Sequence, residues 1–90
     1  MIEKILVCST SNIKESTSNW LKEQVVTSEN MIVYEKEEYG FFIPVIPSCV
    51  SEEIPEDIEK IVRFAIEKEC DWIMIDRDAE GIEGLPTYHW

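Results

Sequence analysis

Four short apolar runs divide this chain of 90 residues, and their spacing limits the folds it can adopt. They span residues 4–8, 31–36, 39–45 and 72–75 and are rich in β-branched and aromatic residues, which is typical of strands. Between the second and third runs there is room only for the short turn Glu37-Glu38, which predicts a hairpin. Pro44 lacks an N–H donor, so strand pairing should weaken near the end of the third run.

Two segments with helical periodicity separate these runs. The first begins at Asn12, which forms a capping-box-like pair with Glu15, and ends near Gln24. Its apolar face is expected to contain Ile13, Thr17, Trp20 and Leu21. The second has Pro55 at its first helical position and runs to about Glu69. Its inner stripe is expected to contain Ile58, Ile61, Val62 and Ala65.

The resulting βαββαβ order predicts one α+β domain over residues 1–90. We expect a ferredoxin-like sandwich, with a four-stranded, mainly antiparallel sheet and both helices on one face. The other face then needs a cover. A second copy of the protein or the chain's own segment 85–90 could supply it.

Charge limits the classes of partner. The net charge is −11, and residues 52–83 alone hold twelve acidic and four basic side chains, a net −8. Such a surface repels nucleic acid and anionic membranes, so direct binding to either is not expected. No apolar run is long enough for a membrane helix and no signal peptide is evident, which indicates a cytoplasmic protein.

The acidic residues form the predicted partner-binding surface. Complementing the dipole of the second helix needs only one or two carboxylates, so the others are unexplained by local structure. A basic protein partner would account for them, and so would solubility. The predicted surface contains Glu52, Glu53, Glu56, Asp57, Glu59, Asp76, Asp78, Glu80 and Glu83.

The loop after the fourth run offers an alternative. Alternating carboxylates at Asp76, Asp78 and Glu80 could converge on a hard cation and begin like an EF-hand loop. The twelfth position, where a bidentate glutamate is expected, holds Thr87. We therefore predict a solvated acidic turn without a metal or cofactor, and keep a metal- or small-ligand-dependent enzyme or sensor at this loop as the alternative.

Nucleophilic catalysis has little support in the sequence. Three widely spaced cysteines without a Cys-x-x-Cys motif indicate reduced, largely buried thiols. Cys8 ends a strand near a helix start, but the one histidine that could serve as its base is His89. No catalytic residue is predicted. The strand aromatics are interpreted as core residues, because the basic residues of RNA-binding sheets are missing.

The chain ends in large aromatic residues. Aromatic rings that stay exposed to water do not gain the free energy of apolar burial. Leu85, Tyr88 and Trp90 are therefore predicted to pack on the domain or on a partner subunit.

Several motifs together resemble a family of small bacterial domains of unknown function carried on plasmids, phages and integrated elements. They are Cys8-Ser-Thr-Ser-Asn-Ile13, Glu38-Tyr-Gly-Phe-Phe-Ile43, Cys70-Asp-Trp-Ile, Asp76-Arg-Asp78 and Leu85-Pro-Thr-Tyr-His-Trp90. The family has His at the position of Asn12 and Asp at that of His89, so neither position is expected to be catalytic. The resemblance implies a mobile-element setting. We expect a non-enzymatic binding or inhibitory protein for a basic, nucleic-acid-binding partner, or a structural subunit that dimerises through the uncovered sheet face.

Overall fold

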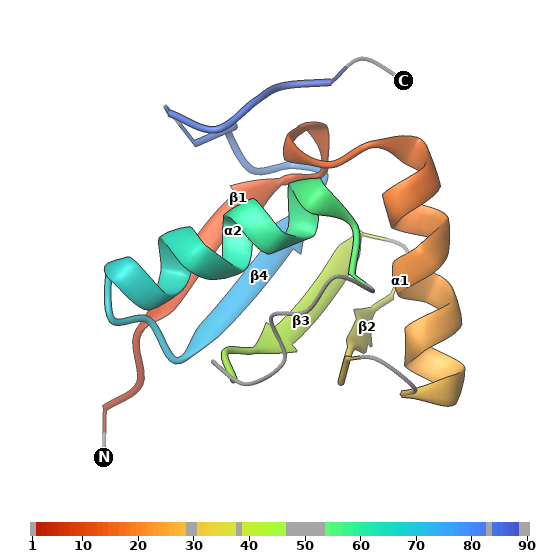
Figure 1. The fold of residues 1–90 in the computed structure, drawn as a ribbon, viewed down its shortest axis with the longest axis horizontal. Helices are drawn as coiled ribbons and strands as arrows, with labels where there is room; N and C mark the ends of the chain where they lie inside the picture. The colour runs from red at the N-terminus through yellow and green to blue at the C-terminus, as the bar shows by residue number, and fades with distance from the viewer. Residues whose placement is uncertain (1, 29–30, 38, 47–53, 83, 89–90) are drawn as a thin grey trace.

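The computed structural model describes residues 2–28, 31–37, 39–46, 54–82 and 84–88 (Figure 1). The elements follow the predicted βαββαβ order, with one short 3-10 helix added. The strands are β1 (Ile5–Ser9), β2 (Tyr34–Lys36), β3 (Gly40–Pro44) and β4 (Trp72–Asp76). The helices are η1 (Thr10–Asn12), α1 (Glu15–Thr27) and α2 (Glu56–Glu67).

The four strands form one mixed sheet in the order β1-β4-β3-β2. β1 runs parallel to β4, whereas the other two pairs are antiparallel. The predicted hairpin is confirmed, because Tyr34 of β2 pairs with Phe42 of β3. Pro44 is the last residue of β3, where it pairs with Trp72. The predicted α+β class, with its mainly antiparallel sheet and ferredoxin-like element order, is therefore confirmed.

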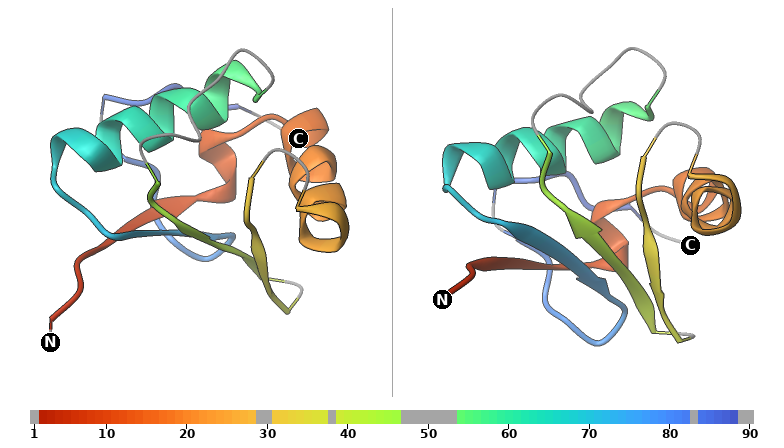
Figure 2. Two further views of the ribbon diagram at one scale, coloured as in Figure 1. Left: turned by 60° about the horizontal axis from the view of Figure 1, so that its bottom comes forward. Right: turned by 90° about the horizontal axis from the view of Figure 1, so that it is seen from below.

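Both helices lie on one side of this sheet, α2 across its middle and α1 beside β2 (Figure 2). The predicted inner stripe of α2 is buried in full, because its apolar positions recur with the helical period. From the sheet, Phe41, Ile43, Ile73 and Ile75 point into the same core. None of the described helices combines the length and the apolar character that crossing a bilayer requires.

The start of α1 differs from the prediction. Asn12 belongs to η1, where its Oδ1 accepts the N–H of Ser9 at 3.2 Å and the Ser9 Oγ accepts the N–H of Ser11 at 3.0 Å. The helix α1 begins at Glu15, and its N-cap residue, Lys14, has no side-chain capping bond. The lysine side chain has no hydrogen-bond acceptor, so the group that caps the helix has to come from elsewhere in the chain.

Asp57, in the first turn of α2, supplies that acceptor. Its carboxylate accepts the N–H of Lys14 at 2.8 Å and the hydroxyl of Thr17 at 2.7 Å. It also accepts its neighbour's N–H, from Ile58, at 3.1 Å. Asp57 is 5% exposed. The residue therefore joins the N-terminal ends of the two helices.

Candidate protein-binding face

The side of the sheet away from the helices carries apolar side chains on all four strands. Strand neighbours alternate between the two faces, and directly paired residues point the same way. The register therefore forms two apolar rows across the sheet, Ile5–Trp72–Pro44 and Val7–Met74–Phe42–Tyr34. We call these seven residues the open face.

Much of the open face is accessible to solvent. Ile5, Val7 and Tyr34 are 49%, 44% and 54% exposed, and the other four residues are half-buried. The rings of Tyr34 and Trp72 reach over β3 and lie 6.2 Å apart. With Glu3, Ile5 and Phe42 they line a shallow groove of about 460 Å³. A contiguous apolar patch of this kind is a mark of an interaction surface.

A polar row closes one end of the open face. Lys36 Nζ lies 2.8 Å from Asp76 Oδ2, across the intervening Gly40. A Cβ at Gly40 would stand 1.6 Å from the carbonyl oxygen of Ile75, so no other residue fits there. The hydrogen bond from Lys36 lowers the pKa of Asp76, and the bond from the Asp78 N–H lowers it further. The apolar rows are thus bordered by a fixed ion pair.

The C-terminal segment lies at the carboxyl end of β1 (Figure 1). The N–H of Tyr88 donates to the carbonyl of Ser11 at 2.7 Å, and Asn12 Nδ2 donates to the carbonyl of Pro86 at 3.0 Å. Leu85 packs against the core. Trp90 lies outside the described residues. The described part of this segment contributes nothing to the groove on the open face.

The predicted acidic surface is only partly assembled. Asp57 is a correction, because it is buried and bonded to α1 and so cannot meet a partner. Glu56 and Glu59 lie on α2 and pair with Lys60 at 3.5 Å and Arg63 at 2.8 Å. Asp78 and Glu80 are exposed, and Asp76 is held by Lys36. Glu52, Glu53 and Glu83 lie outside the described residues.

The chemistry of the remaining candidates is limited. Within the described ranges, no three His, Cys, Asp or Glu side chains gather where they could hold a metal ion. Burial raises the pKa of the Cys8 thiol to about 12, which keeps it protonated and a poor nucleophile at neutral pH. Cys49 and His89 fall outside the described ranges.

Comparison with known proteins places the chain in a family. Residues 5–90 match the family model described as "Family of unknown function (DUF5983) C-terminal domain". The chain belongs to the DUF5983 C-terminal domain family. No curated protein and no solved structure matches it significantly.

The sequence did not predict which residues of this DUF5983 domain form the open face. Tyr34, Phe42 and Trp72 were interpreted as core, but they lie on the uncovered side, and of the strand aromatics Phe41 alone is fully buried. A signal was present, because the apolar runs of β1 and β4 do not alternate with polar residues. Continuous apolar runs are typical of strands covered on both faces.

Proposed function

We propose that this DUF5983 domain is a non-enzymatic binding protein whose open face docks a basic protein partner. The observation that carries the proposal is the two apolar rows, which cross three and four strands in register and remain accessible. Burying large apolar and aromatic side chains is the main source of affinity in protein interfaces. An uncovered sheet face gains this energy only when a partner docks.

The partner could be a second copy of the chain or a different, basic protein, and charge distinguishes between the two. A second copy would bring another net charge of −11 to the contact, and such like-charge repulsion opposes self-association. A partner with lysine and arginine around an apolar centre would instead be attracted. Glu3 stands at the groove, where its carboxylate accepts the indole N–H of Trp72 at 2.9 Å, and it could meet a partner cation. We therefore favour a basic partner over a homodimer.

Site-specific photo-crosslinking in the native host would test the proposal. A photoreactive residue at Val7, on the open face, should capture the partner, and one at Arg63, on the exposed side of α2, should not. The captured protein is then purified and its Kd measured. The double variant Val7→Thr, Met74→Gln should weaken binding by about tenfold or more, which is about 1.4 kcal/mol. The control variant Glu67→Gln, on α2, should bind normally.

Two results would overturn the proposal. One is a purified partner whose affinity is unchanged by the Val7 and Met74 substitutions. The other is sedimentation showing that the protein alone forms a dimer that the same substitutions dissociate, since a second copy would then occupy the face. Affinity for a basic partner should also fall as salt rises, because screening weakens charge attraction.

The resemblance noted from the sequence motifs suggests a setting for this activity. We propose a cytoplasmic protein encoded on a mobile element, whose basic partner is a nucleic-acid-binding protein of the host or its defence. An acidic domain can compete with the phosphate backbone for the basic surface of such a protein.

A further inference from the structure

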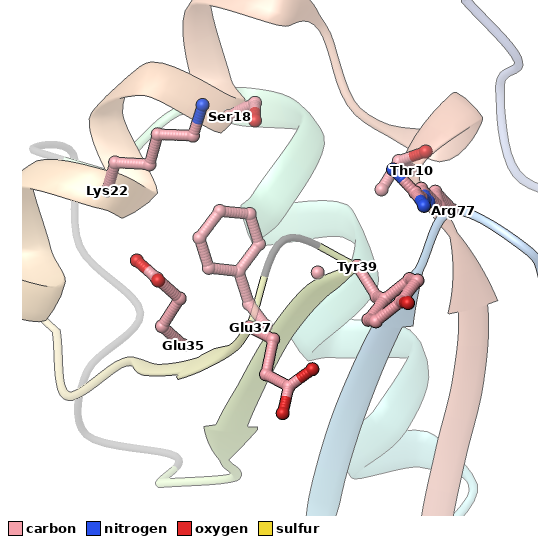
Figure 3. A pocket seen from close by; sticks show the side chains of 9 residues that line it. Thr10, Ser18, Lys22, Glu35, Glu37, Tyr39 and Arg77 are labelled. Carbon is pink, nitrogen blue, oxygen red and sulfur yellow. The ribbon is translucent and has the colours of Figure 1, made fainter.

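A cavity of about 400 Å³ lies on the helix side of the sheet, separate from the open face (Figure 3). Its walls come from α1, from the β2–β3 hairpin and from the two chain segments that leave β1 and β4. The carboxyl ends of parallel strands are a common place for ligands in α/β proteins, and this volume falls within the range of small-molecule sites. The proposed docking of a protein partner uses none of these residues.

Two cations and two carboxylates line the cavity and come from different parts of the fold. Lys22 lies on α1 and Arg77 follows β4, whereas Glu35 lies on β2 and Glu37 directly follows that strand (Figure 3). All eight basic residues belong to the described part of the chain, and within it the side chain of Lys22 alone has no hydrogen bond, ion pair or ring contact. The Lys22 side chain is exposed and is therefore available to a ligand.

Aromatic side chains also line the cavity. Phe41, which is 4% exposed, is one of them. The Tyr39 ring forms one wall and is held by the Arg77 guanidinium, 4.5 Å from its centroid. Ser18 lies near Lys22 and Thr10 lies near Arg77 (Figure 3), and their hydroxyls add hydrogen-bonding groups for an anion.

We infer that this cavity binds a small zwitterion, of which α-amino acids are the simplest class. Its carboxylate would face Lys22, Arg77 and the two hydroxyls, its ammonium would face Glu35 and Glu37, and its side chain would cover Phe41. A simple anion would be repelled by the two carboxylates and by the net charge of −11. A simple cation would be repelled by Lys22 and Arg77 and would leave Lys22 without a partner.

The backbone conformation of Glu37 allows a matched test of that carboxylate. Glu37 has a φ of 47°, in the left-handed region, where a residue other than glycine, asparagine or aspartate is disfavoured. Glu69, at the end of α2, has a similar φ of 59° and lies away from the cavity. The pair provides a matched comparison, because Glu37→Asn and Glu69→Asn remove the same charge and relieve the same kind of strain.

The test is an NMR titration of the whole domain with the common L-amino acids, followed through the backbone amides of Gly40, Phe41 and Arg77. The best binder is then compared with its decarboxylated amine and with its deaminated acid. We expect each single-charge analogue to bind about tenfold more weakly. Lys22→Gln and Glu37→Asn should weaken binding several-fold, while Lys60→Gln and Glu69→Asn should not.

Three results would each overturn the inference. The first is that no amino acid moves the cavity amides at millimolar concentration. The second is that the amine or the acid binds as tightly as the zwitterion. The third is that Lys22→Gln and Glu37→Asn bind like the wild-type protein. Because none of these substitutions touches the open face, they leave the proposed docking of a protein partner untested and unaffected.

Discussion

Replacing Asp57 with alanine should strongly destabilise the domain. The substitution removes the acceptor for the Lys14 N–H, which caps α1, and for the buried Thr17 hydroxyl. Loss of an N-cap acceptor costs about 0.5–2 kcal/mol, and a buried donor left without a partner costs about 1–3 kcal/mol. Because the two costs overlap at Lys14, we expect a loss of about 3 kcal/mol in the free energy of unfolding.

Urea unfolding followed by circular dichroism measures this loss. For a domain of this size the change corresponds to a fall in Tm of roughly 10–20 °C. Glu56→Ala is the matched control, because Glu56 precedes Asp57 on the same helix but its side chain is 82% exposed and its ion pair with Lys60 is long. That variant should lose less than about 1 kcal/mol. If Asp57→Ala costs no more than Glu56→Ala, the carboxylate does not join the helices.

Three further predictions follow from single residues. The folded-state pKa of Asp76 is lowered, so the carboxylate stabilises the folded domain at neutral pH and Asp76→Asn should reduce the free energy of unfolding there. In urea titrations this difference between wild type and variant should decrease as the pH falls below the ordinary pKa of 3.8 and through the folded-state pKa. Cys8, with a pKa of about 12, should resist iodoacetamide in the native protein and react only in urea, as peptide mass spectrometry would show. Asn12→Ala should cost about 2–3 kcal/mol and speed hydrogen exchange at the Ile82 amide, because Asn12 Oδ1 accepts that N–H and the one of Ser9.

Most of the correctly predicted fold follows from the spacing of apolar residues along the sequence. The inner stripe of α2 follows from apolar residues at helical spacing, and the hairpin follows from two β-rich runs separated by a short turn. These are local patterns, and each is contained within a few neighbouring residues. The boundary of α1 was less predictable, since Asn12 carries a typical capping residue type but makes its bonds to Ser9 and to the C-terminal segment instead.

The roles of single charged residues depend on contacts that local patterns do not contain. Asp57 was predicted to belong to the acidic partner-binding surface, because the start of α2 carries more carboxylates than the helix dipole needs. Its burial depends on Lys14 and Thr17, which lie 43 and 40 residues earlier, at the start of a helix whose N-cap side chain makes no capping bond. The cavity is a stronger case, because Lys22, Glu35 and Arg77 are far apart in the sequence and line one cavity only in the folded domain.

The position of the C-terminal segment links the two proposals. The sequence allowed this segment to cover the second face of the sheet, and that arrangement would have made the open face an ordinary part of the core. Instead Asn12, itself 1% exposed, binds Pro86 and Ile82 and holds the segment at the carboxyl end of β1. The described segment thus leaves both the apolar rows and the cavity accessible, on opposite sides of the sheet.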